Sequence, residues 1–434
     1  MSQLSTRGGK SLHGHIRVPG DKSISHRTLL LGCLADGRSH IRGFLPSADC
    51  LATLGCIRAL GIGVRADNAT TLIIQGHGLH GPQRPTAPLD CVRSGTTMRL
   101  LAGIIAGRAF EGKGATLTGD SQLLRRPMGR IARPLRRMGA HIETTDGHAP
   151  LTIYGRRLHG CEHTLPVASA QVKSAILLAA LYADGPTIVR QPGPARDHTE
   201  LMLKAMDADV ETSGLSVTLT PRPSPLSPLD LTVPGDISSA SFPLAAGLLV
   251  PGAAVTVEQV GVNPTRTGLL DVLRTMGADI SVENRRDEGG EPVADVSVSA
   301  SELCSGEISG PTVVRMIDEF PLLAVVATQA EGVTVVRDAA ELRVKETDRI
   351  AVIASELEKM GARIDPQGDG FAVTGPTALQ GTVVDSHGDH RIAMALAVAG
   401  LVARGETVVQ DADCIVDSFP GFVETMQGIG ATIT

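Results

Sequence analysis

The chain has 434 residues, of which 42% are hydrophobic and 20% are charged, and its formal net charge is −6 at pH 7. This length exceeds one ordinary domain core, and the composition is typical of a folded protein rather than a disordered one. Aromatic side chains make up only 2% of the residues. Together with the negative net charge, this argues against a nucleic-acid-binding surface.

Targeting segments are not evident. Segment 1–18 has no apolar stretch, so we expect no signal peptide. The run 237–257 has no charged residue, but it contains Pro243 and Pro251, so we expect a segment of a soluble domain rather than a membrane span. No pair among the seven cysteines has Cys-x-x-Cys spacing. We therefore expect reduced thiols, no zinc site and a cytoplasmic location.

A short pattern recurs six times: the end of a helix, a Gly or Asp, and the apolar start of a strand. Its copies are roughly 70 residues apart and are centred on Gly61, Gly139, Asp207, Gly277, Gly361 and Gly430. Glycine after a helix supplies the left-handed residue that ends it. Each copy therefore predicts a helix C-terminus followed by a strand.

Each copy is preceded by an Ala- and Leu-rich helix and a Val- and Thr-rich strand, as in 25–34 followed by 39–42. We therefore predict an α/β fold built from six similar units of two helices and three or four strands. The sequence Val-Pro-Gly-Asp occurs at 18–21 and again at 233–236, where the chain is expected to change direction. This predicts one domain over 21–234 and a second formed by 1–20 with 235–434.

The predicted helices begin at loops that carry small, capping or charged residues, namely 21–23, 93–97, 169–171, 236–239, 318–321 and 389–391. Helix N-termini attract anions. Basic residues lie in or near these loops (Lys22, Arg27, Arg93, Arg99, Lys173 and Arg391), and further ones lie at 125–126 and 343–349. An acidic protein with cations at its helix starts is suited to small, multiply charged anions.

Two other patterns are weaker. Gly76-His77-Gly78-Leu79-His80-Gly81 matches a dinucleotide-binding motif, but prolines follow it where that motif requires a helix. The cluster 385–390 holds Asp and His side chains that suit a metal ion, but Asp389 as a helix cap explains it more simply. We expect no metal site.

These motifs resemble those of the 5-enolpyruvylshikimate-3-phosphate (EPSP) synthase family. The matching segments are 19–27 (PGDKSISHR), 94–99 (SGTTMR), 126–128 (RPM), 169–171 (SAQ), 343–349 (RVKETDR) and 389–394 (DHRIAM). The resemblance implies two similar domains, each of three βαβαββ-type units, with helix N-termini facing an interdomain cleft. It implies transfer of the enolpyruvyl group of phosphoenolpyruvate (PEP) to the 5-hydroxyl of shikimate-3-phosphate, with release of phosphate and without a metal or organic cofactor. We expect a monomer with no nucleic-acid or membrane partner.

The resemblance also implies roles for individual residues. Shikimate-3-phosphate would be bound by Lys22, Ser23, Arg27, Ser169, Ala170, Gln171, Arg196, Asp318 and Lys345. PEP would be bound by Lys22, Gly95, Arg126, Gln171, Arg349 and Arg391, with Thr96, Arg99, Asp389 and His390 nearby. Asp318 would be the base on the hydroxyl, Glu346 the acid on the PEP methylene, and Lys345 and Lys22 catalytic cations. Lys345 is an alternative for the acid role, and Asp318 could be a helix cap alone.

Three positions depart from the family pattern. Arg93 stands where many members have Asn, and Asp417 lies where some place a lysine. A Ser and a Tyr used by some members are absent, and Arg196 lies in their region, which suggests a contact to the shikimate phosphate.

Two other functions remain open at this point. One is an enolpyruvyl transferase that acts on UDP-N-acetylglucosamine. Many enzymes of that kind carry a reactive cysteine in the stretch that corresponds to residues 111–130, where this chain has no cysteine. The other is a non-catalytic anion-binding protein, which would be expected to lack Asp318, Glu346 or Lys345.

Overall fold

The computed structural model describes residues 3–108, 110 and 113–434. The chain folds into two compact units, each with its own hydrophobic core. Unit 1 comprises residues 1–19, 234–287 and 292–434, and unit 2 comprises residues 20–233 and 288–291. Residues 288–291 lie within the range 235–434 that we expected in the other domain, but in the structure they belong to unit 2. No helix among the described residues is long and apolar enough to cross a membrane.

Unit 2 contains seven helices among its described residues: α1 (Lys22–Leu34), α2 (Ala48–Ala59), α3 (Gly95–Gly107), α4 (Ser121–Leu124), α5 (Gly129–Arg137), α6 (Ala170–Ala180) and α7 (His198–Ala205). Its strands are β3 (Asp36–Arg42), β4 (Gly63–Asn68), β5 (Thr71–His77), β6 (Leu89–Asp90), β7 (Gly114–Thr118), β8 (His141–Thr145), β9 (His148–Tyr154), β10 (Glu162–Thr164), β11 (Thr187–Arg190), β12 (Asp209–Ser213), β13 (Ser216–Thr220) and β14 (Asp230–Thr232).

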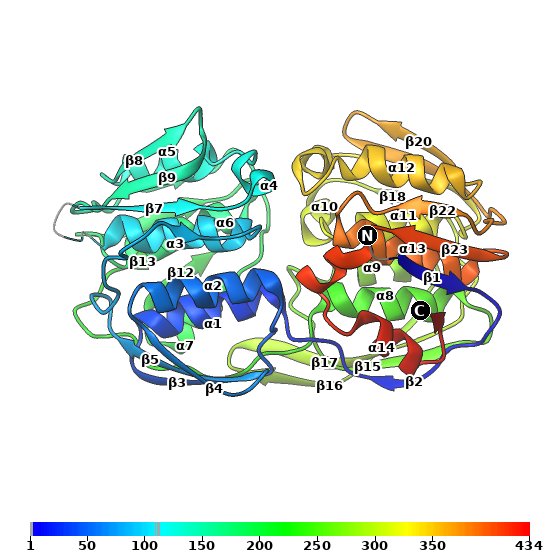
Figure 1. Ribbon diagram of the computed structural model, residues 1–434, viewed down its shortest axis with the longest axis horizontal. Helices are drawn as coiled ribbons and strands as arrows, with labels where there is room; N and C mark the ends of the chain where they lie inside the picture. Colours follow the sequence, from blue (N-terminus) through cyan, green and yellow to red (C-terminus); the bar gives the residue numbers. More distant parts are fainter. Residues whose placement is uncertain (1–2, 109, 111–112) are drawn as a thin grey trace. The chain divides into compact units, whose positions relative to one another are not determined.

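The strands of unit 2 form three four-stranded sheets with one shared topology. Their strand orders are β14-β3-β5-β4, β6-β7-β9-β8 and β10-β11-β13-β12. Figure 1 shows β3, β4 and β5 of one sheet together at the bottom of the unit, and β7, β8 and β9 of another near its top. In each sheet the first strand runs parallel to the second, and the other pairings are antiparallel. The last two sheets follow the chain order βαβαββ, and β14 closes the first sheet from the far end of the unit.

Unit 1 repeats this arrangement. Its strands are β1 (Gln3–Arg7), β2 (His13–Ile16), β15 (Ala254–Gly261), β16 (Asp279–Glu288), β17 (Glu291–Ser299), β18 (Glu307–Ile308), β19 (Gly332–Val336), β20 (Arg363–Gln367), β21 (Gly370–Gly375), β22 (Val383–Asp385), β23 (Glu406–Gln410) and β24 (Thr432–Ile433). Its sheets are β16-β17-β15-β2, β18-β19-β21-β20 and β22-β23-β1-β24. The predicted α/β fold of three βαβαββ-type repeats in each half is confirmed.

The helices of unit 1 are α8 (Ile237–Leu249), α9 (Gly268–Thr275), α10 (Pro311–Arg315), α11 (Phe320–Ala327), α12 (Arg349–Lys359), α13 (His390–Val402) and α14 (Phe422–Gly428), with 3₁₀ turns η2 (Ala340–Val344) and η3 (Ala412–Asp417). In each unit one helix of every repeat is almost wholly buried, namely α1, α3, α6, α8, α11 and α13. These helices are apolar around most of their circumference, as expected for helices in a domain centre. α3 packs on α6 and α1, and α13 packs on α8 and α11.

The residues at the six repeat centres all have positive φ, from 63° at Asp207 to 107° at Gly139. This is the left-handed conformation that the sequence predicted at the helix ends. At the opposite ends, the side chains of Asp21, Ser94, Ser169, Asp236 and Asp389 cap the buried helices by accepting a backbone N–H. Helix α11 is the exception, because Glu319 at its cap position makes no such bond. Several predicted site residues are the first residues of these capped helices, among them Lys22, Gly95 and Ala170.

The tip of one hairpin belongs to the unit that does not contain its strands. β16 and β17 lie in a sheet of unit 1, whereas residues 288–291 at their turn belong to unit 2. There Glu291 Oε1 lies 2.6 Å from Nδ1 of His198, and the two side chains are almost fully buried. Polar groups buried to this extent normally require such partners.

Candidate active site

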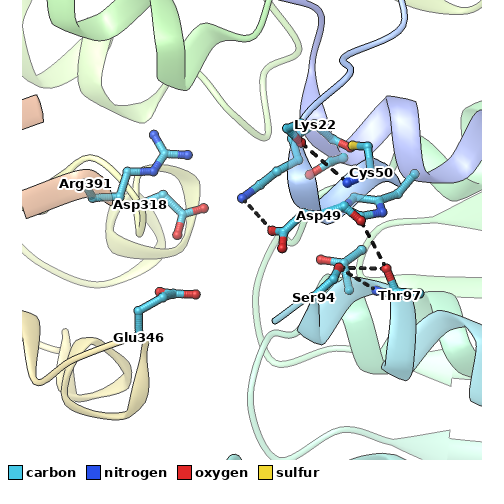
Figure 2. Close-up of polar contacts among 12 residues, drawn as sticks. Lys22, Asp49, Cys50, Ser94, Thr97, Asp318, Glu346 and Arg391 are labelled. Atoms are coloured by element: carbon cyan, nitrogen blue, oxygen red, sulfur yellow. Dashed lines mark hydrogen bonds and ion pairs between the residues drawn. The ribbon is translucent and has the colours of Figure 1, made fainter. Parts of the chain in front are cut away.

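Lys22 is the first residue of helix α1, where Asp21 Oδ1 accepts the N–H of Ile24 at 2.9 Å. The ammonium of Lys22 lies 3.2 Å from Oδ2 of Asp49, in the first turn of α2, and both side chains are about one fifth exposed. Figure 2 shows this pair, with Cys50 Sγ donating to the Lys22 carbonyl. Lys22 keeps partial access to solvent, and Asp49 neutralises part of its charge.

A network of hydroxyl groups fixes the starts of helices α2 and α3 beside this pair. Thr97 Oγ1 lies 2.7 Å from the cap Ser94 and 2.6 Å from Thr53, and it is 3.5 Å from the Asp49 carbonyl (Figure 2). Thr53 in turn shares a 2.7 Å hydrogen bond with His26 Nδ1. Burial lowers the pKa of His26 well below its ordinary value, so this ring is neutral at pH 7.

Arg27 ties three helices together. Its Nε donates to Thr199 Oγ1 at 2.7 Å, Nη1 to the Ser23 carbonyl at 2.8 Å, and Nη2 to Ser174 Oγ at 2.8 Å. Burial lowers the pKa of Arg27 to about 10, and the group stays charged at pH 7. Arg196 Nη1 donates to Ser23 Oγ at 3.5 Å. The structure thus brings together the predicted residues Ser23, Arg27 and Arg196.

Gly95, at the start of α3, adjoins two arginines. A Cβ at this position would lie 2.9 Å from Nη1 of Arg126 and 3.3 Å from Nη1 of Arg99. Arg99 also donates to the side-chain oxygen of Gln171, whose Nε2 donates to Thr96 Oγ1 at 3.0 Å. Gly95, Arg126 and Gln171, three of the predicted PEP residues of unit 2, therefore lie in one group with Arg99 and Thr96.

Ser169 caps helix α6 by accepting the N–H of Val172, and Ala170 is the first helical residue. Lys173, counted above among the cations suited to anions, is instead fully buried and lies 2.6 Å from Glu200 Oε1. Its position one turn into α6 directs it into the core of unit 2.

In unit 1, a single arginine contacts three carboxylates. Arg349, the first residue of α12, lies 2.7 Å from Glu346, 2.8 Å from Asp389 and 3.4 Å from Asp318. Lys345 Nζ is also 3.4 Å from Asp318 Oδ1. The predicted base and acid thus share one cationic partner, and each carboxyl remains about one fifth to one quarter exposed.

The charge of Arg349 is held firmly. Burial alone would lower its pKa, but the neighbouring carboxylates, Asp389 first, outweigh burial and raise the pKa further. Asp389 is fully buried, accepts from Thr347 Oγ1 at 3.2 Å, and caps α13 by accepting the N–H of Arg391 at 2.9 Å. His390 and Arg391 follow as the first residues of that helix.

The Asp and His side chains of the cluster 385–390 make contacts within the protein. No group of three or more His, Cys, Asp or Glu side chains among the described residues could hold a metal ion. His387 Nε2 instead contacts Glu356 Oε1 at 3.0 Å, and Asp385 Oδ1 accepts the N–H of His387. Asp389 serves as the helix cap that the sequence suggested.

Arg93 is exposed and forms an ion pair with Asp120, the cap residue of α4, at 3.1 Å. Part of its charge is therefore neutralised within the loop. Residues 111 and 112 of the stretch 111–130, compared above for a cysteine, lie outside the described residues.

Sequence reasoning did not identify Asp49 or Thr199. Asp49 faces Lys22 from a different helix, and Thr199 links Arg27 to Ser174. Their only local signal is a position in the first turn of a helix, which many ordinary residues share. Their contacts depend on how α1, α2 and α7 pack.

Comparisons with known proteins show the family of this chain. The family model described as EPSP synthase (3-phosphoshikimate 1-carboxyvinyltransferase) matches residues 6–426. A 3-phosphoshikimate 1-carboxyvinyltransferase of Citrifermentans bemidjiense is 52% identical over 431 residues, covering 99% of each chain. One from Geobacillus kaustophilus is 50% identical over 423 residues, covering 96% of this chain and 98% of that protein. A solved EPSP synthase of Acinetobacter baumannii is 43% identical with a TM-score of 0.89, covering 100% of this chain and 99% of that one.

Proposed function

This chain belongs to the EPSP synthase family, and from that membership we infer the roles of the residues at its helix N-termini. The enzyme transfers the enolpyruvyl group of PEP to the 5-hydroxyl of shikimate-3-phosphate and releases phosphate. The observation that carries the assignment is the gathering of Asp318, Glu346 and Lys345 with Arg349, in a chain matched along nearly its whole length.

Shikimate-3-phosphate is assigned to Lys22, Ser23, Arg27, Ser169, Ala170, Gln171, Arg196, Asp318 and Lys345. This assignment is supported by the contacts that join Ser23, Arg27 and Arg196. Two arginines and the capped start of α6 offer a phosphate group both charge and directed N–H donors.

PEP is assigned to Lys22, Gly95, Arg126, Gln171, Arg349 and Arg391. Both substrates are anions, so their approach requires cations that offset the repulsion. Gly95 supports the assignment because the absence of a side chain leaves Arg126 and Arg99 room beside the backbone.

Two proton transfers open the reaction. Asp318 takes the proton of the 5-hydroxyl, and Glu346 delivers a proton to the PEP methylene, so the oxygen can bond to the carbon that bears the phosphate. In the second half of the reaction the Glu346 carboxylate takes back a proton from the new methyl group, the bond between carbon and the phosphate oxygen breaks, and the double bond is restored. The departing phosphate takes the proton that Asp318 removed from the hydroxyl, so both carboxyl groups return to their starting states. Lys22 and Lys345 stabilise the charge that develops during these steps. Lys345 supports this scheme by its contact with Asp318.

A coupled phosphate assay tests this function. We expect release of phosphate from PEP only when shikimate-3-phosphate is supplied. Release with UDP-N-acetylglucosamine in its place would assign the chain to the other transferase class. Tight binding of shikimate-3-phosphate without turnover would instead identify a non-catalytic anion-binding protein.

The proposed enzyme acts in the cytoplasm as a monomer. Seven free cysteines and no disulfide among the described residues are consistent with a reducing compartment. Light scattering of the purified protein at several concentrations should give the mass of one chain, 45.1 kDa. A concentration-dependent mass of twice that value would contradict the monomer.

A further inference from the structure

Helices α6 and α7 are joined by an ion pair inside unit 2. Lys173 Nζ lies 2.6 Å from Glu200 Oε1, and the two side chains are 1% and 3% exposed. A buried pair of this kind contributes little net stability, because desolvation offsets much of its attraction. Its place in the fold suggests a role other than stability.

The ammonium of Lys173 makes a second contact, to the backbone that leads into Arg196. Its Nζ donates to the carbonyl of Ala195 at 3.2 Å. The next residue, Arg196, donates to Ser23 Oγ from the same loop. Lys173 therefore connects the interior of α6 to the segment that presents Arg196.

Glu200 is connected to the same group of residues from the other side. Its neighbour Thr199 shares a 2.7 Å hydrogen bond with Ser174, which follows Lys173, and accepts from Arg27 at 2.7 Å. The charge of Glu200 also opposes the lowering of the pKa of Arg27 by burial. Segment 195–200 is thus held against α6 and α1 at several points.

We propose that Lys173 and Glu200 are positioning residues for recognition of the shikimate phosphate. Their ion pair fixes segment 195–200 on helix α6, and so fixes Arg196 and Arg27 relative to Ser23. Neither Lys173 nor Glu200 contacts the substrate in this scheme. The proposal rests on the function proposed above, and it adds two buried residues that the family motifs quoted for the site do not include.

The test replaces the pair by two apolar residues, Lys173→Met with Glu200→Leu. The charges of the pair cancel in the native protein and are absent in the variant, so a change in net charge cannot explain a change in binding. We expect the KM for shikimate-3-phosphate to rise about tenfold, while kcat and the KM for PEP change less than about twofold. Calorimetric titration with shikimate-3-phosphate alone should show the same loss of affinity.

A general loss of stability is separated by a matched control, Ile142→Ala, which truncates a buried residue of β8, a strand that packs on β9 and α5. This control should lower the melting temperature and leave both KM values unchanged. If the double variant keeps its affinity for shikimate-3-phosphate, or loses affinity for both substrates equally, the proposal is wrong.

A second variant covers the case in which the apolar pair does not fold. Lys173→Gln with Glu200→Gln keeps similar shapes and hydrogen-bonding groups, but the shorter side chain at 173 cannot reach the Ala195 carbonyl. The same selective rise in the KM for shikimate-3-phosphate is expected, and an unchanged KM would overturn the proposal. Failure of the native enzyme to use shikimate-3-phosphate would instead contradict the proposed function.

Discussion

Asp389 holds Arg349 through both of its carboxylate oxygens, with Nε 2.8 Å from Oδ2 and Nη2 3.2 Å from Oδ1. Oδ1 also accepts the N–H of Arg391 at the start of α13. One buried carboxylate therefore sets both the first helical residue of α12 and the start of α13. Arg349 and Arg391, two of the three arginines assigned to PEP, therefore depend on the same side chain.

Replacing Asp389 by Asn should weaken both the fold and PEP binding. The amide can still cap α13, but it cannot accept from the guanidinium through two charged oxygens. We expect the free energy of unfolding in urea to fall by about 1.5–3 kcal/mol, and the KM for PEP to rise. The control Asp348→Asn changes the partly exposed cap of α12 and should cost less than about 1 kcal/mol. Equal losses in the two variants would contradict this interpretation.

Replacing Asp318 by Asn should remove the proposed base while keeping its size. We expect kcat to fall by about 10²–10⁴-fold, with little change in the affinity for shikimate-3-phosphate measured by calorimetry. The control Glu307→Gln makes the same carboxyl-to-amide change at an exposed ion pair on β18 and should leave kcat unchanged. A normal kcat for the Asp318 variant would exclude Asp318 as the base.

Replacing Gly95 by Ala should disturb PEP alone. The new methyl group would meet Nη1 of Arg126 at 2.9 Å and push this side chain away. Because displacement of a positioning group by about 1 Å can cost up to about 10²-fold, we expect a rise of about 10- to 100-fold in the KM for PEP. Gly129 also begins a helix, but its Cβ would have no neighbour closer than 3.9 Å, so Gly129→Ala should be silent. Equal effects at both positions would disprove the steric explanation.

Stability should depend on pH through His163 of β10. Burial, with a smaller contribution from Arg137, lowers the pKa of His163 from 6.5 to about 4. Between these values the unfolded chain binds a proton that the folded protein does not, so stability decreases as the pH falls from 6.5 to about 4.

Replacing His163 by Gln should remove up to about 3 kcal/mol of this decrease, measured as the difference between urea unfolding at about pH 7.5 and about pH 4.5. If the variant keeps the native difference in unfolding free energy between the two pH values, the pKa of His163 is not lowered in the folded protein.

The repeated fold could be predicted because its signals are local. A glycine such as Gly139, which ends a helix at positive φ, or a cap such as Ser94 constrains only its neighbours in the chain, and both are legible in sequence. The loops that carry Lys22 and Arg391 could be found in the same way.

The residues that escaped prediction are determined by packing. Lys173 has the sequence context of a loop cation, but one helical turn places it in the core against Glu200. Asp49 faces Lys22 only because α1 and α2 pack together. Contacts between separate helices have no fixed spacing in sequence, so the pattern of residues could not reveal them.

The hairpin whose turn, 288–291, belongs to unit 2 has a consequence for dissecting the chain. Expression of residues 20–233 alone would omit Glu291, and the buried ring of His198 would lose its carboxylate partner. Severing the polypeptide at Val233 therefore does not give two self-sufficient pieces. A fragment that reproduces unit 2 has to include residues 288–291, either fused to residues 20–233 or added as a separate peptide.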